Sequence, residues 1–154
     1  MQIEILQLIS GAKNARGLTV IIDVFRAFST ACYIMDAGAE RIITVEHVED
    51  ALHLKRIKDG AILLGERNER KVSGFDFGNS PTHILNHDFT GKTVIRTTSS
   101  GTRGIINARS ADKIITGSFV NAGAVISYIR DINPSVLSLV CMGYSALFPI
   151  EEDT

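Results

Sequence analysis

The stretch that decides the fold is LTVIIDVFRAFSTACYIMD, which covers residues 18–36. Its first part, Leu18–Ile22, is almost wholly apolar, as in a strand that is buried on both faces. Asp23 interrupts the apolar run, and an amphipathic segment at Ala27–Asp36 predicts a helix. A buried strand that leads directly into a helix is the repeating unit of parallel α/β folds.

The same unit recurs along the chain on both sides of this stretch. The pattern predicts strands at Gln2–Leu8, Leu18–Ile22, Arg41–Val45, Ala61–Leu64, Lys92–Arg96, Lys113–Thr116 and Val136–Met142. It predicts helices at Ala27–Asp36, Val48–Lys58, Ser100–Arg109 and Val120–Arg130, with a short one near Pro81–Leu85. Several strands are apolar on both faces, so helices must cover each side of their sheet. We therefore expect one α/β domain over residues 1–154, a three-layer sandwich whose mainly parallel or mixed sheet is flanked by helices.

Composition excludes several classes of protein. Hydrophobic residues make up 45% of the chain, charged residues make up 21%, and the net charge is −1. This balance gives no broad basic surface for a nucleic acid and no charged membrane anchor. No apolar stretch reaches the roughly 18 residues of a membrane span, and the start of the chain lacks a signal-peptide pattern. We expect a cytoplasmic protein that binds no nucleic acid and no membrane, and a homodimer is compatible with the sequence.

Polar residues follow four of the predicted strands. Asp23 and Arg26 follow the second strand, and Glu66 and Arg67 follow the fourth. The run TTSSGTR at residues 97–103 follows the fifth strand, and Asn121 comes shortly after the sixth. Ligands of open α/β sheets bind beyond the carboxyl ends of the strands. In one parallel sheet these four groups would meet at a single edge, which predicts a site there.

The TTSSGTR run has the composition of an anion-binding turn. Small residues between a strand and a helix let backbone N–H groups approach a phosphate, and the helix dipole adds to the attraction. An arginine here could make a bidentate contact to phosphoryl oxygens. On spacing alone, the more ordinary interpretation is simple capping of the helix by Ser99 or Ser100. The candidate phosphate-binding residues in and near this run are Ser99, Ser100, Gly101, Thr102, Arg103 and Asn121.

Carboxylates near the same edge suggest a magnesium site. Mg²⁺ prefers one or two carboxylates together with substrate oxygens and water. The candidate ligands are Asp23, Glu66, Asp76 and Asp153, and Asp76 lies in a long polar loop at residues 65–81. Asp23 could instead cap the following helix or pair with Arg26. Arg67 could contact the substrate or hold Glu66 and the Asp76 loop in place.

Other known phosphatase and metal motifs are absent. The residue two beyond Asp23 is Phe25, so the DxD pair of haloacid-dehalogenase phosphatases is missing. Neither cysteine begins a C-x5-R signature, and there is no Walker A loop. His83 and His87 are four residues apart, but without a third ligand they predict exposed histidines rather than a metal site.

Seven pieces of the sequence, taken in order, resemble the 2-phosphosulfolactate phosphatase family of coenzyme M biosynthesis. They are IIDVFRAFSTA (21–31), GAERIITVE (38–46), LLGERN (63–68), GFDFGNSP (74–81), TTSSGTRGI (97–105), GSFVNA (117–122) and EEDT (151–154). The resemblance implies a three-layer α/β fold and a Mg²⁺-dependent hydrolase of phosphate esters of small 2-hydroxy acids. Its matching positions imply functional roles for Asp23, Arg26, Glu66, Arg67, Asp76, Gly78, Asn79 and Ser80.

The chain departs from the family pattern in three places. Family members usually read RATT where Arg26–Ser29 stands, and TNGT where Ser99–Thr102 stands. Ser100 in place of an asparagine removes one amide that could contact a substrate. Relatives also continue beyond the acidic EEDT piece, so we expect that C-terminal elements present in relatives are missing here.

The sequence and the resemblance thus predict catalytic roles for Asp23, Arg26, Glu66, Arg67 and Asp76, a phosphate-binding role for Asn79, and Mg²⁺ as cofactor. The substrate would be a small anionic phosphate ester. Attack by water and an aspartyl-phosphate intermediate at Asp23 are both open. Two other classes stay open as well, namely a non-catalytic phosphate-binding module of the same fold and a structural assembly subunit.

Overall fold

The computed structural model describes residues 1–154. The strands are β1 (Gln2–Gln7), β2 (Gly17–Ile22), β3 (Arg41–Thr44), β4 (Ile62–Arg67), β5 (Arg70–Lys71), β6 (Thr93–Thr97), β7 (Ala111–Gly117) and β8 (Val136–Cys141). The helices are α1 (Leu8–Asn14), α2 (Ser29–Asp36), α3 (Val48–Ile57), α4 (Gly101–Asn107) and α5 (Ala122–Ile132). Short helical turns are η1 (Val24–Phe28), η2 (Pro81–His83), η3 (Phe119–Asn121) and η4 (Glu151–Asp153). None of the helices is both long and apolar enough to span a lipid bilayer.

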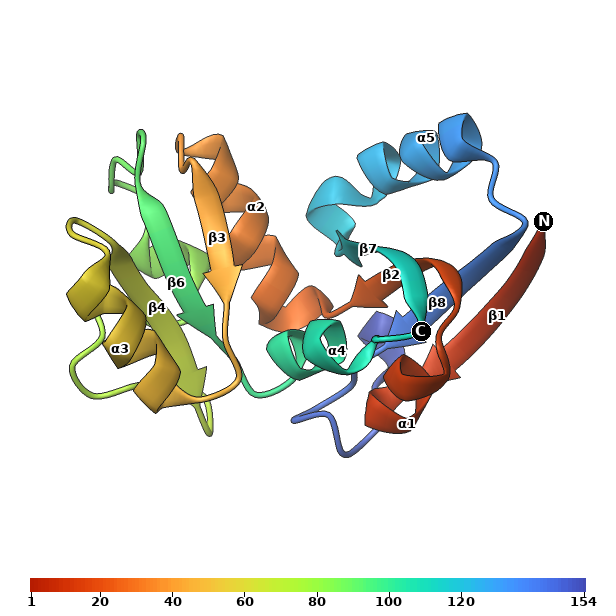
Figure 1. The fold of residues 1–154 in the computed structure, drawn as a ribbon, viewed down its shortest axis with the longest axis horizontal. Helices are drawn as coiled ribbons and strands as arrows, with labels where there is room; N and C mark the ends of the chain where they lie inside the picture. The colour runs from red at the N-terminus through yellow and green to blue at the C-terminus, as the bar shows by residue number, and fades with distance from the viewer.

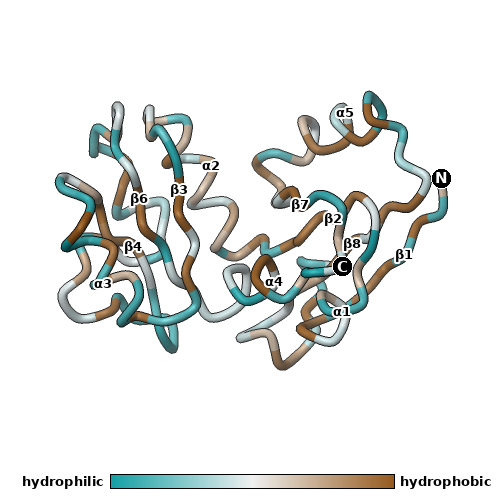
Figure 2. The backbone as a smooth tube through the Cα atoms, viewed as in Figure 1, coloured by the Kyte–Doolittle hydropathy of each residue, from teal (hydrophilic) through white to brown (hydrophobic).

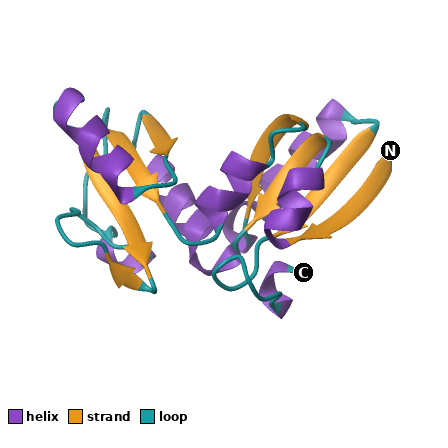
Figure 3. Cartoon of the chain, turned by 60° about the horizontal axis from the view of Figure 1, so that its bottom comes forward, coloured by secondary structure: helices purple, strands orange, loops and turns teal.

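The strands form two sheets, not the one that the sequence pattern suggested. Sheet 1 has the order β1-β8-β2-β7, and sheet 2 has the order β3-β6-β4-β5 (Figure 1). Every pairing is parallel except that of β4 with β5. The expected α/β class with mainly parallel strands is therefore confirmed. The chain enters sheet 2 after β2 and returns to sheet 1 after β6, and Figure 3 shows the two sheets as separate blocks with helices between them.

Both faces of sheet 1 are covered by helices. Ala12 of α1 and Ile105 of α4 pack with Ile21 of β2 on one face. Val125 of α5 packs with Leu18 of β2 on the other face. The apolar stretches of the strands, brown in Figure 2, lie between these helices. Sheet 1 is thus the middle of three layers.

Sheet 2 is also covered on both faces. Ala51 of α3 packs with Leu63 of β4 on one side. On the other side Ile34 of α2 packs with Leu64 of β4 and with Phe89, which follows η2. The three-layer arrangement expected for a single sheet is therefore present twice. The single domain expected over residues 1–154 stays a prediction.

One helix was not expected from the sequence. The strand predicted at residues 2–8 ends at Gln7, and α1 begins with Leu8, whose φ is +60°. The alternating pattern of the strand runs on into the helix, so it gives no sign of the boundary. Gly11 permits the tight turn, because a Cβ there would lie 2.9 Å from Leu6 Cβ.

Gly104 of α4 lies where this helix meets the core of sheet 1. A Cβ at this position would lie 2.6 Å from Met142 Sδ and 2.7 Å from Ile21 Cγ2. We expect Gly104→Ala to lower the free energy of unfolding by about 1–3 kcal/mol, because the packed core cannot take the extra carbon. Urea denaturation measures the change. Gly123→Ala in α5 is the matched control, since no atom lies within 4 Å of its Cβ, and it should be stabilising by roughly 0.5–1 kcal/mol. An unchanged or higher stability of Gly104→Ala would contradict the packing.

Candidate active site

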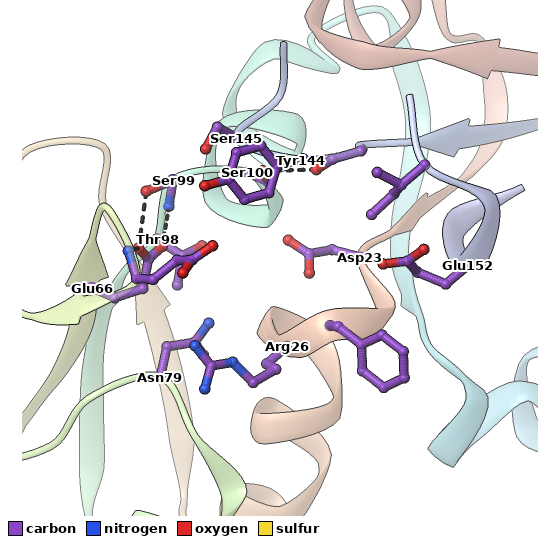
Figure 4. A pocket seen from close by; sticks show the side chains of 14 residues that line it. Asp23, Arg26, Glu66, Asn79, Thr98, Ser99, Ser100, Tyr144, Ser145 and Glu152 are labelled. Carbon is purple, nitrogen blue, oxygen red and sulfur yellow. Dashed lines mark hydrogen bonds between the residues drawn. The ribbon is translucent and has the colours of Figure 1, made fainter. Parts of the chain in front are cut away.

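A polar pocket of about 620 Å³ opens where strand ends of the two sheets face each other. β2 contributes Asp23, β4 contributes Glu66, and the turn after β6 contributes Thr98–Ser100. The loop after β8 forms a further wall. Figure 4 shows the Asp23 carboxylate pointing into the pocket, across from Glu66 and Ser99. The lining residues are Asp23, Phe25, Arg26, Glu66, Glu69, Asn79, Thr98, Ser99, Ser100, Gly143, Tyr144, Ser145, Ile150 and Glu152.

Asp23 is the most deeply buried acid of this pocket. Its Oδ1 accepts a hydrogen bond from the Ala27 N–H at 3.0 Å, and its Oδ2 accepts one from the Gly101 N–H at 2.8 Å. Burial raises the pKa of Asp23 from its ordinary value of 3.8 to about 6, although these two N–H groups and Arg96 act to lower it. Asp23 therefore has the capping role left open from the sequence and a place in the pocket. It makes no ion pair with Arg26.

Glu66 is held by the hydroxyl-rich turn after β6. Its Oε1 accepts from the Ser99 N–H at 2.7 Å, and its Oε2 accepts from Ser99 Oγ and from the Glu69 N–H, both at 3.1 Å. The side chain is 8% exposed. The end of β4 and the turn after β6 are thereby joined at the pocket floor.

The turn at residues 99–103, predicted to bind an anionic ligand, donates hydrogen bonds to side chains of the protein itself. The N–H groups of Ser99 and Gly101 donate to Glu66 and Asp23, and the Thr102 N–H donates to Thr98 Oγ1. The protein's own carboxylates therefore satisfy the N–H groups of Ser99 and Gly101, and binding of a phosphate by this turn stays a prediction. Ser100 Oγ donates to the Gly143 carbonyl and does not cap α4.

Arg26 and Asn79 supply the pocket with free hydrogen-bond donors. Arg26 is exposed, and its guanidinium has no hydrogen-bond or ion-pair partner in the protein. Asn79 is 7% exposed and lines the same side, where Figure 4 shows it near Arg26. Asn79 Oδ1 accepts from Arg96, so its Nδ2 group is left to face other partners. A positive charge and amide donors suit an anionic ligand.

Besides Gly101, whose N–H donates to Asp23, and Asp76, four predicted binding or catalytic residues lie outside the pocket lining. Arg67 donates to the carbonyls of Glu66 and Glu46 and to Thr97 Oγ1, which fits the holding role and not substrate contact. The other three are Thr102, which is buried behind the turn, Arg103, which is half-buried on α4, and Asn121. Asn121 accepts from Ser118 and donates to the Thr116 carbonyl. The end of β7 therefore does not join the site, because β7 is the edge strand of sheet 1.

Two of the predicted metal ligands are placed elsewhere. Asp76 accepts from the Leu63 N–H at 2.7 Å and pairs with Lys55 at 3.2 Å, outside the pocket. Asp153 accepts from the Val24 and Gly143 N–H groups, each at 2.8 Å, and burial raises its pKa. Both carboxylates accept hydrogen bonds from backbone N–H groups of other segments and so hold those segments in place. The expected set of Asp23, Glu66, Asp76 and Asp153 is not brought together.

No three histidine, cysteine or acidic side chains lie close enough to hold a metal ion by themselves. The acids that do line the pocket are Asp23, Glu66, Glu69 and Glu152. Mg²⁺ commonly takes only one or two carboxylates and fills its remaining positions with water and phosphate oxygens. The pocket therefore fits a Mg²⁺ ion that is shared with a phosphate ester, but not a metal cage made by protein alone.

The sequence analysis missed part of the pocket. Glu69 lines it from a turn of positive φ, and Glu152 lines it from η4. Tyr144 and Ser145 lie in the loop after β8, and the neighbouring Glu69 carboxylate raises the pKa of the Tyr144 phenol. The polar and aromatic run GYS after the last strand was the available signal.

Residues 3–154 match the family model described as 2-phosphosulpholactate phosphatase. The chain belongs to this family. The resemblance drawn from the seven pieces is thereby confirmed, and the 2-phosphosulfolactate phosphatase motifs contribute Asp23, Arg26, Glu66 and Asn79 to one pocket.

Curated relatives in this family share extensive identity with the chain. The protein named "Probable 2-phosphosulfolactate phosphatase" of Thermotoga petrophila is 41% identical over 133 residues, which cover 86% of this chain and 56% of that protein. The protein of the same name in Carboxydothermus hydrogenoformans is 39% identical over 153 residues, covering 99% of this chain and 63% of that protein. A third, from Clostridium acetobutylicum, is 39% identical over 136 residues, covering 86% and 57% respectively. The matched regions thus span 56% to 63% of the length of these relatives.

Proposed function

We propose that the pocket hydrolyses phosphate monoesters of small 2-hydroxy acids with the help of Mg²⁺. The observation that carries the proposal is one cavity in which a buried aspartate faces an arginine that has no partner in the protein. This arrangement places a group that can transfer a proton and a positive charge that can bind an anion in the same pocket. The family membership and the names of the relatives support the reaction type.

Asp23 is the group that we assign to proton transfer. A carboxylate with a pKa of about 6 is largely ionised at neutral pH and still basic enough to take a proton from an attacking water. The two backbone N–H groups fix the direction of its oxygens, so the proton acceptor is already oriented when substrate enters. A free lone pair remains on each oxygen for this purpose.

Arg26 and the pocket hydroxyls are assigned to substrate binding. The exposed guanidinium of Arg26 neutralises negative charge on the phosphoryl oxygens. This stabilisation becomes stronger in the transition state, as the bond to the leaving oxygen breaks. Asn79 and Ser145 offer further donors around the pocket wall. A carboxylate on the substrate can use the donors that the phosphoryl group leaves free.

Glu152, which lines the pocket beside Asp23 (Figure 4), is the residue of this chain that would hold Mg²⁺, with water and substrate oxygens at the remaining positions, whereas Asp23 is kept for proton transfer. The ion supplies Lewis-acid polarisation of the phosphoryl group when it is bound. The metal-binding roles predicted for Asp76 and Asp153 are not carried into this proposal, because neither residue lines the pocket.

Release of inorganic phosphate tests the function directly. The purified protein is assayed with p-nitrophenyl phosphate and with phosphoglycolate, each with and without Mg²⁺. We expect turnover that requires Mg²⁺ and that favours phosphoglycolate, because its carboxylate can use the additional donors. Binding of phosphate without turnover would favour a non-catalytic phosphate-binding module. Absence of both, including of thermal protection by phosphate or Mg²⁺, would favour a structural subunit.

A further inference from the structure

Arg96, the fourth residue of β6, carries a buried positive charge directly behind the pocket. It is 3% exposed, and its guanidinium lies over the ring of Phe28 at 5.9 Å. One terminal nitrogen donates both to the Ala27 carbonyl and to Asn79 Oδ1, the latter at 3.2 Å. Arg96 therefore links sheet 2, the turn that carries Arg26, and the loop that carries Asn79.

The contact to Asn79 determines which way the amide points. A guanidinium has only donors, so the atom of Asn79 that faces Arg96 must be the carbonyl oxygen. The amide nitrogen is then on the opposite side, and Asn79 lines the pocket. Its Nδ2 group donates to no acceptor in the protein. The donors of this amide are thus directed to whatever occupies the pocket.

Burial of the charged guanidinium of Arg96 is energetically unfavourable. Burial lowers the pKa of Arg96 to about 10, and its Nε has no hydrogen-bond partner. The attraction to Asp23 and Glu66 opposes this effect of burial. That attraction does not account for the hydrogen bond to Asn79 Oδ1, which fixes the direction of an uncharged side chain at the pocket.

We propose that Arg96 is a positioning residue, which locks the Asn79 amide so that its N–H donors face the anionic oxygens of the bound substrate. This inference rests on the proposed phosphatase function. Without Arg96 the amide can rotate by half a turn and present its oxygen to the substrate, which repels an anion. The hydrogen bond from Arg96 to Asn79 therefore affects ground-state binding of the anion more than the chemical step.

A double-mutant cycle between residues 96 and 79 tests the lock. Arg96→Lys keeps a positive charge but loses the planar fork, and Asn79→Ala removes the amide that is to be oriented. We expect Arg96→Lys to lower kcat/KM about tenfold, mainly through a higher KM, and to weaken inhibition by inorganic phosphate by a similar factor. In the Asn79→Ala background the same substitution should change kcat/KM less than about twofold.

Arg67→Lys is the matched control for the loss of an arginine fork. Arg67 also holds backbone carbonyls and a threonine hydroxyl next to the site, but it makes no contact with Asn79. Its effect on kcat/KM should be equal in the two backgrounds. Thermal unfolding of each variant shows that the comparison is made between folded proteins.

The outcomes separate this inference from the proposed function. Turnover in the wild type with equal effects of Arg96→Lys in both backgrounds would overturn the positioning role alone. Phosphate binding without turnover, with the two residues coupled in binding, would support the positioning role and overturn the phosphatase function. Neither turnover nor phosphate binding in the wild type would overturn both.

Discussion

Replacing Asp23 with asparagine is expected to reduce turnover by about 10²- to 10⁴-fold while raising the free energy of unfolding at neutral pH. Turnover falls because an amide cannot accept the proton of the attacking water. Stability rises because the variant no longer buries a charge: the shift of the Asp23 pKa from 3.8 to about 6 corresponds to about 3 kcal/mol. The asparagine amide has only one acceptor oxygen, so one of the two backbone N–H bonds is lost, which lowers the free energy of unfolding by about 1 kcal/mol.

The direction of the pH dependence follows from the same shift. Because the folded state holds the Asp23 proton more tightly than the unfolded state, the free energy of unfolding falls as pH rises from about 4 to about 6. The amide of the Asp23→Asn variant has no proton to lose over this range. The stability difference between the variant and the wild type should therefore be small near pH 4 and reach about 2 kcal/mol above pH 6.5.

Urea denaturation at pH 4 and pH 7.5, with phosphate release as the activity assay, measures both effects. Asp76→Asn is the matched control, because Asp76 is half-exposed and lies outside the pocket. It should keep its turnover and lose about 1 kcal/mol of stability or less. A loss of stability in the Asp23 variant at pH 7.5, or a difference that does not depend on pH, would contradict the buried charged carboxylate.

The second large effect is expected from Arg96→Met. Arg96 lowers the pKa of Asp23, and Asp23 and Glu66 in turn oppose the effect of burial on Arg96. Removing the guanidinium leaves two buried carboxylates without a positive neighbour and takes the donor from the Ala27 carbonyl and Asn79 Oδ1, which costs about 1–3 kcal/mol. The cost should be smaller near pH 5, where Asp23 takes up a proton, than at pH 8.

Urea denaturation at the two pH values tests this expectation. Arg103→Met is the control, because Arg103 is half-buried on α4 and its side chain has no partner in the protein. Its change should stay within about 0.5 kcal/mol. A loss below about 1 kcal/mol for Arg96→Met at pH 8 would show that Arg96 does not compensate the carboxylates.

The secondary structure could be predicted from the sequence where the pattern is local. The seven strands and the main helices lie close to the predicted ranges, because burial on both faces leaves long apolar runs such as Leu18–Ile22. The exceptions are α1, which continues the pattern of β1, and the two-residue strand β5. Short elements carry too few residues for a period to be recognised.

The site was predicted in part. Asp23, Arg26, Glu66 and Asn79 share one pocket with Ser99 and Ser100, whereas Asp76, Arg103 and Asn121 do not line it. The hydroxyl-rich turn was predicted to bind a phosphate, and the sequence could not show that Glu66 and Asp23 accept hydrogen bonds from its N–H groups. Arg96 gave only a weak signal, a charge within an otherwise apolar strand.

Local patterns were enough to assign the main strands and helices, to locate the polar strand ends, and to place the motifs in their family. They could not show how the strands divide between two sheets, which of the polar ends meet, or where each carboxylate finds its N–H donors; folding in three dimensions set all of these. The physical reason is range. Periodicity and capping act within a few residues, whereas the pocket depends on contacts between residues as distant as Asp23 and Gly101, or Val24 and Asp153.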